Sequence, residues 1–120
     1  MPRVLIIDDA AFMRLAIRRM LEKHGFEIVG EAENGNVGIK KYLELMPEIV
    51  TMDITMPELG GIEALKAILQ HDPKAKVIIV SAMGQEEMVR EAVMYGAKTF
   101  IVKPIIEEHL VRILTKVAAM

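Results

Sequence analysis

Five polar side chains in this sequence come directly after short apolar segments. They are Asp8, Asp9, Asp53, Ser81 and Lys103. Their apolar neighbours have the length and character of strands in a parallel sheet, and the carboxyl ends of such strands meet at one edge, where ligands bind. We therefore expect three carboxylates, one hydroxyl and one ammonium group to converge on a single place. Each residue alone is unremarkable in type, so the prediction depends on their joint position at four strand ends.

These side chains together favour phosphoryl-transfer chemistry. Three neighbouring carboxylates repel one another, and each would take up a proton unless a cation offset the charge. Mg²⁺ suits the group because it prefers oxygen ligands and often binds through one or two carboxylates together with phosphate. Lys103 would hold the phosphate as a point charge, and Ser81 would donate a hydrogen bond to it. A carboxylate could then act as nucleophile and form an aspartyl phosphate.

Asp53 is the candidate nucleophile. It ends the apolar segment 49–52, and the segment 56–61 that follows contains one proline and two glycines. Such a loop leaves an open approach for phosphate. The predicted catalytic residues are therefore Asp53, Ser81 and Lys103.

Apolar runs too short for helices alternate with longer segments of helical period, which indicates a repeated strand–helix order. The predicted strands are Val4–Ile7, Phe26–Glu31, Ile49–Met52, Val77–Val80 and Phe100–Val102. The predicted helices are Ala11–Lys23, Asn36–Leu45, Ile62–Gln70, Glu86–Tyr95 and Glu107–Val117. Continuous apolar strands suit a parallel sheet with helices on both faces, so the fold class is α/β. Strand 26–31 alternates more and is expected at an edge. Gly38 is unfavourable inside a helix by about 1 kcal/mol relative to alanine.

Composition limits the classes of protein to consider. The chain has 120 residues and no linker-like tract, which predicts one domain over residues 1–120. A net charge of −2 with no basic block argues against nucleic acid as a partner. The longest apolar runs have four residues, so we expect no membrane span and no signal peptide. The chain has no cysteine, which excludes disulfides and agrees with a cytoplasmic location.

Four motifs, in this order and spacing, resemble those of the response-regulator receiver domains, and the resemblance covers essentially the whole chain. The motifs are Val4–Asp9, Met52–Pro57, Ser81–Met83 and Lys103-Pro104. The segments 9–14 and 81–85 are similar to those of the chemotaxis branch of that family in Gram-positive, thermophilic and archaeal systems. The resemblance implies a flavodoxin-like, doubly wound parallel sheet of strand order 2-1-3-4-5.

The resemblance also implies a phosphorylation site and a metal site. Asp53 matches the phosphoacceptor of the family. Asp9 and Asp53 match direct Mg²⁺ ligands, Asp8 matches a carboxylate that acts through a bound water, and Thr55 would bind the metal through its backbone carbonyl.

Three residues match the residues of the family that contact the phosphoryl group or change position on phosphorylation. Ser81 and Lys103 match the residues that contact the phosphoryl group. Phe100, three residues before Lys103, matches the aromatic switch residue, which turns into the space that the hydroxyl residue leaves. The Lys103-Pro104 peptide bond is implied to be cis, an option specific to proline.

The predicted helix 86–95 carries two apolar stripes at helical spacing. The first consists of Met88, Ala92 and Tyr95, and we expect it to cover the sheet. Val89 and Val93 form the second stripe beside it. This second stripe either widens the buried face or, together with Phe100, forms a docking patch for a partner protein.

The resemblance implies a monomeric switch, not an enzyme with an external substrate, that catalyses only its own phosphorylation and dephosphorylation. A histidine kinase of the CheA class would phosphorylate it, and the flagellar motor switch protein would read it. Thr55 and Met83 flank the place where water would attack, and neither carries an amide or a carboxylate to orient that water. We therefore expect slow self-dephosphorylation and an auxiliary phosphatase.

Two other functions fit parts of the sequence. A single-domain receiver in another phosphorelay would differ only in its partner. An aspartate-nucleophile phosphatase of the haloacid-dehalogenase type also has an apolar strand that ends in aspartate. Such enzymes usually need a second aspartate two residues later, where this chain has Thr55, and additional chain for a cap. Turnover of a small phosphate ester that depends on Asp53 would support the phosphatase.

Overall fold

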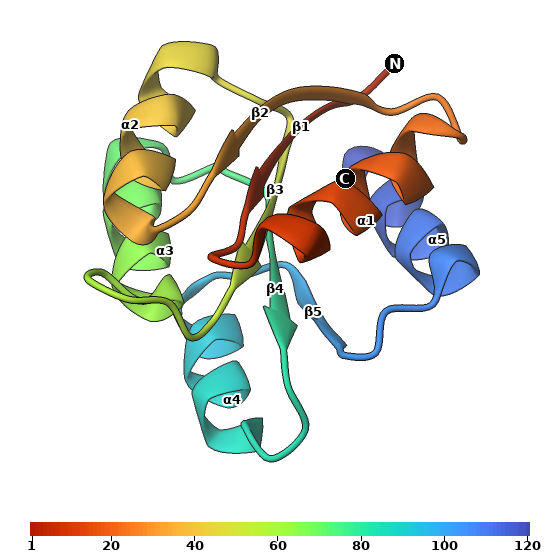
Figure 1. Cartoon of the computed structure of the whole chain (residues 1–120). Helices are drawn as coiled ribbons and strands as arrows, with labels where there is room; N and C mark the ends of the chain where they lie inside the picture. Colours follow the sequence, from red (N-terminus) through yellow and green to blue (C-terminus); the bar gives the residue numbers. More distant parts are fainter.

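The computed structural model describes all residues from 1 to 120, as a five-stranded parallel sheet between two layers of helices (Figure 1). The strands are β1 (Arg3–Ile7), β2 (Glu27–Ala32), β3 (Ile49–Asp53), β4 (Val77–Ser81) and β5 (Thr99–Val102). The helices are α1 (Ala11–Glu22), α2 (Gly35–Leu45), α3 (Gly61–His71), α4 (Glu86–Tyr95) and α5 (Glu107–Ala118). The strand order is β2-β1-β3-β4-β5, so the predicted α/β fold and sheet order are confirmed.

The two faces of the sheet bury separate apolar cores. Helices α1 and α5 cover one face, and α2, α3 and α4 cover the other (Figure 1). Successive side chains of β1 point to opposite faces, so Val4 and Ile6 join the α1/α5 core while Leu5 and Ile7 join the other. Each such side chain contributes about 1.5–3 kcal/mol when fully buried. This two-sided burial explains why the segment is apolar without alternation, whereas the more alternating β2 lies at the sheet edge and is only partly buried.

Gly38 allows α2 to approach β1 closely. A Cβ atom at this position would lie 2.5 Å from Cδ1 and 3.1 Å from Cγ1 of the fully buried Ile7. The low helix propensity of glycine is therefore offset by a close contact between the helix and the central part of the sheet.

Helix α4 faces the sheet with a different set of residues from the predicted stripe. Val89 and Ala92 are its buried residues, whereas Met88 and Tyr95 are 38% and 46% exposed. The prediction that Met88 and Tyr95 cover the sheet was therefore wrong, and only Ala92 of that stripe is inside. The Tyr95 ring instead lies 5.2 Å from Lys66 Nζ of α3, a cation–π distance.

Candidate phosphoacceptor site

Three carboxylates meet at the carboxyl edge of the sheet. Asp53 is the last residue of β3, and Asp8 and Asp9 follow β1 directly. Because β1 and β3 are neighbours in the sheet, one carboxylate oxygen from each of the three lies within 4.8 Å of the others. Asp8 and Asp53 are buried, while Asp9 is exposed and leaves the cluster open to solvent. The predicted convergence of these side chains is confirmed in the geometry.

Lys103 supplies the positive charge of the site. Its Nζ lies 3.5 Å from Asp53 Oδ1 and 3.7 Å from Asp8 Oδ2. The Lys103 backbone N–H donates to Ser81 O at 2.7 Å, which ties the residue after β5 to the end of β4. The Lys103-Pro104 bond is cis, as predicted.

Asp53 carries an unusual proton affinity as a result of this environment. Burial raises the pKa of Asp53 to about 6, and the charges of Asp8 and then Asp9 act in the same direction, whereas Lys103 lowers it. Burial, together with the two neighbouring carboxylates, thus outweighs the one ammonium group in its effect on the pKa of Asp53. A carboxylate whose pKa is perturbed in this way, in an accessible cluster, marks a candidate functional group.

The donor set fits a hard divalent cation. Asp8 Oδ1 accepts a hydrogen bond from Ala10 N at 2.9 Å, but its buried Oδ2 has no hydrogen-bond partner. A buried charged oxygen without a partner is costly. Together with the oxygens of Asp9 and Asp53, it forms an all-oxygen group of the type that Mg²⁺ prefers.

Ser81 and Thr55 lie on neighbouring strand ends but make no hydrogen bond to the carboxylates. Ser81 is the last residue of β4, and its buried hydroxyl has no hydrogen-bond partner. Thr55 lies two residues after Asp53 in the β3–α3 loop, where its exposed hydroxyl accepts a hydrogen bond from Gln85 Nε2 at 2.7 Å. The structure thus places Ser81 at the strand end next to Asp53 but assigns no partner to its hydroxyl.

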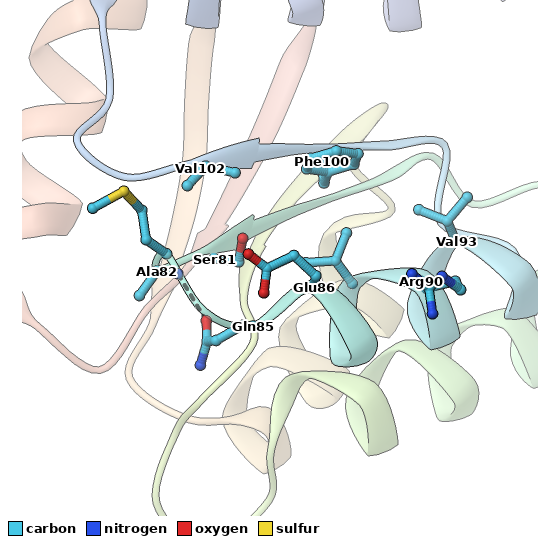
Figure 2. Close-up of a pocket in the computed structure, with 10 residues that line it drawn as sticks. Ser81, Ala82, Gln85, Glu86, Arg90, Val93, Phe100 and Val102 are labelled. Carbon is cyan, nitrogen blue, oxygen red and sulfur yellow. Dashed lines mark hydrogen bonds between the residues drawn. The ribbon is translucent and has the colours of Figure 1, made fainter.

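A cavity of about 380 Å³ separates α4 from β5, and Ser81 forms part of its lining (Figure 2). Most of its walls are apolar, with Val89, Val93, Phe100 and Val102 among the lining residues. Phe100 is 44% and Val93 39% exposed, whereas Val89 is only 7% exposed and belongs to the core. Of the two valines in the predicted docking patch, only Val93 therefore offers substantial surface.

Two residues of the site were missed from the sequence. Arg14 donates from Nη1 to Asp8 O at 2.7 Å and from Nε to Glu31 at 3.1 Å, which fixes the backbone beside the acidic cluster. Gln85 bridges two loops through its side-chain amide. Both residues lie in the segments 9–14 and 81–85 that resemble the chemotaxis branch of the family, but neither has a spacing that predicts these hydrogen bonds.

The family match agrees with the geometry. Residues 4–115 match the response regulator receiver domain, and the chain therefore belongs to this family of phospho-accepting switches. Within it, the chain is 56% identical to chemotaxis protein CheY of Thermotoga maritima over 116 residues, 97% of each chain. It is 50% identical to a protein named CcdB of Bacillus subtilis, over 98% of each chain.

A solved structure resembles the fold over nearly its whole length. It is the CheX-CheY-BeF3-Mg²⁺ complex from Borrelia burgdorferi, with a TM-score of 0.92 and 38% sequence identity. The match covers 96% of this chain and 87% of that chain.

The helices of this chain include none long and apolar enough to cross a membrane.

Proposed function

We propose that the chain is a single-domain response regulator of chemotaxis that accepts a phosphoryl group on Asp53. The observation that carries the proposal is the buried Asp53 carboxylate beside Asp8, Asp9 and the Lys103 ammonium group. Relatives named chemotaxis protein CheY support the assignment to chemotaxis.

The proposed transfer uses Asp53 as nucleophile. A carboxylate oxygen of Asp53 forms a bond to phosphorus while phosphorus loses its bond to the leaving group, which is a histidine nitrogen of the kinase. The histidine keeps the electron pair of that bond, and its nitrogen takes up a proton. Lys103, 3.5 Å from Asp53, stabilises the negative charge of the transferring group.

Mg²⁺ is the proposed cofactor. Asp9 and Asp53 would bind it directly, Asp8 through a water, and Thr55 through its backbone carbonyl. When bound, it would offset the negative charge of the carboxylates and of the phosphoryl group. Oδ2 of Asp8 supports this assignment because it accepts no hydrogen bond, and because Lys103 Nζ, the cation 3.7 Å away, is shared with Asp53.

Ser81 and Phe100 are the proposed switch. The partnerless Ser81 hydroxyl would turn toward the phosphoryl group and donate a hydrogen bond to it. Phe100 lines the same cavity as Ser81 and is about half exposed, so its ring has space to turn inward (Figure 2). This coupled movement would change the surface between α4 and β5.

That surface is the proposed docking patch, with Val93 and Phe100 as its exposed part and Val89 as its buried floor. The proposed reader of this patch is the flagellar motor switch protein, whereas a histidine kinase of the CheA class would phosphorylate Asp53. Val93→Glu should abolish binding to the motor switch protein and leave phosphorylation intact, because Val93 lies away from the acceptor. If this variant still binds the motor switch protein, the surface is not the docking patch.

An auxiliary phosphatase is the proposed route for switching off. Neither Thr55 nor Met83 offers an amide or carboxylate that could orient the attacking water. The relative crystallised as a CheX-CheY complex supports a protein helper. Loss of the phosphoryl group within seconds in the isolated protein would contradict this proposal.

Intact-mass measurement after incubation with acetyl phosphate tests the acceptor. The wild type should gain one phosphoryl group with Mg²⁺ and none with a chelator, and Asp53→Asn should gain none. Asp72→Asn is a matched control, because Asp72 ends α3 away from the cluster, and it should behave as the wild type. No gain by folded wild-type protein would refute the proposal.

A receiver in another phosphorelay is the second candidate. The relative of nearly equal length that is named CcdB favours it, since its name does not refer to chemotaxis. Binding of the phosphorylated chain to the motor switch protein would support chemotaxis, and binding only to another phosphorelay protein would support the alternative.

A further inference from the structure

The Gln85 side chain joins the two loops that flank the acceptor. Its Oε1 accepts a hydrogen bond from Ala82 N at 2.7 Å, and its Nε2 donates to Thr55 Oγ1 at 2.7 Å. Figure 2 shows the first of these bonds, which closes the turn between β4 and α4. One carboxamide thus holds the β4–α4 loop to the β3–α3 loop, and we call this pair of bonds the Gln85 clasp.

Local structure aims the Gln85 side chain at these loops and away from its own helix. Gly84 has φ +90°, a conformation that favours glycine and turns the chain back toward Ala82. Gln85 is the N-cap residue of α4, yet its side chain makes no capping hydrogen bond. The side chains that usually cap a helix are those of Ser, Thr, Asp and Asn, so the Gln85 amide is left available for the clasp.

The clasp lies just beyond the ends of β3 and β4, the strands that end in Asp53 and Ser81. Asp53 pairs with Val80 in the register of β3 and β4, so the ends of these two strands are side by side. Thr55 follows Asp53 by two residues, and Ala82 directly follows Ser81. The clasp therefore fixes the backbone next to Ser81, whose buried hydroxyl has no partner in this arrangement.

An anion on Asp53 would compete with the clasp. A phosphoryl group carries strong acceptor oxygens, and backbone N–H groups at strand ends are natural donors to such an anion. The first N–H after Ser81 belongs to Ala82 and is already bonded to Gln85 Oε1. A movement of Ser81 toward the anion would pull on this bond, since the two residues are adjacent.

We infer that Gln85 is a positioning residue that stabilises the resting form of the β4–α4 loop and so sets the threshold for switching. The inference rests on the proposed phosphoacceptor function of Asp53. A contact made only in the resting form lowers the affinity for any ligand that prefers the switched form. Removal of the clasp should therefore raise the affinity for a phosphoryl group or its mimic.

Titration with beryllofluoride in the presence of Mg²⁺, followed by NMR of the backbone amides, tests this. Gln85→Leu removes both hydrogen bonds with little change in size, and it should bind beryllofluoride about fivefold more tightly than the wild type, the order of factor that a neutral hydrogen bond represents. The Ala82 amide should also exchange with solvent faster in the resting variant. Gln70→Leu makes the same chemical change at an exposed position of α3 and should leave both quantities unchanged.

The direction in which the affinity for beryllofluoride changes distinguishes the proposed role of Gln85 from a general structural role. A variant that merely loosened the site would bind the mimic more weakly. Thr55→Val removes only the second bond of the clasp and keeps the backbone carbonyl, so it should also tighten binding and serves if Gln85→Leu fails to fold.

Each outcome decides between the two proposals. Equal or weaker binding by folded Gln85→Leu and Thr55→Val, with normal binding by the wild type, would overturn the clasp alone. A wild type that binds no beryllofluoride and gains no phosphoryl group from acetyl phosphate would refute the acceptor function, and the clasp with it.

Discussion

Replacement of Asp53 by asparagine should stabilise the metal-free protein at neutral pH. The folded chain raises the pKa of Asp53 because it buries the carboxyl group and places it near Asp8. A raised pKa means that the folded chain holds the proton more tightly than the unfolded chain does, so the ionised carboxylate opposes folding. Asparagine has a similar shape and carries no charge, so it removes the free-energy cost of burying the ionised carboxylate.

The structure sets the size of the effect. The difference between a pKa of about 6 and the ordinary value of 3.8 corresponds to at most about 3 kcal/mol, since one pKa unit equals about 1.4 kcal/mol. Water that reaches the open side of the cluster screens part of this, so we expect about 1–2 kcal/mol at pH 7. The gain in the free energy of unfolding from asparagine should be complete above about pH 6. It should vanish below about pH 4, where Asp53 becomes protonated in the folded and in the unfolded wild type.

Urea unfolding with a chelator, at pH 7 and at pH 4, measures this difference. Asp9→Asn is the control, because Asp9 is exposed and its charge is better solvated, and it should change the free energy of unfolding much less. Added Mg²⁺ should reduce the difference between the wild type and Asp53→Asn, because it stabilises the ionised cluster. If Asp53→Asn is less stable than the wild type at pH 7 in the chelator, the electrostatic reasoning is wrong.

Three further substitutions test other parts of the structure. Lys103→Met should slow phosphorylation by acetyl phosphate at least about tenfold, because it removes the ammonium group that faces the acceptor, and an unchanged rate in the mass assay would exclude that role. Gly38→Ala should lower the free energy of unfolding by about 1–3 kcal/mol through its clash with Ile7, whereas a gain in urea resistance would show that Ile7 yields easily. Tyr42→Phe should cost about 1 kcal/mol in the same assay, because it removes the 2.7 Å bond to Asp72, unless water replaces that bond without loss.

The sequence was sufficient to predict the elements and the meeting of the three carboxylates, for a physical reason. Strands covered on both faces need continuous apolar runs, so each run shows where a strand ends and therefore where Asp53 and Ser81 lie. The match of the motifs to a known family supplied the strand order and the cis bond at Lys103-Pro104, which no local pattern determines.

The remaining details depend on contacts between elements. Helical period indicates an apolar stripe on α4, but the way the helix rests on the sheet decides that Val89 and not Met88 is buried. The need for glycine at position 38 follows only from the folded structure, in which Ile7 of β1 packs directly against it. The two bonds of Gln85 depend on the backbone path of two separate loops, which composition and spacing do not contain.

The order of strands in the sheet determines how far the phosphorylation signal has to travel. The acceptor ends β3 and Phe100 lies on β5, and β4 is the single strand between them. Two strand spacings amount to about 10 Å. In the proposed switch, the phosphoryl group would attach at the carboxyl end of the central strand β3, and the partner protein would bind beside the edge strand β5. Over so short a path the proposed signal needs no rearrangement of the fold. Because a typical protein interface covers about 800 Å² on each partner, a protein that acts on the acceptor and another that reads the flank would compete for the chain.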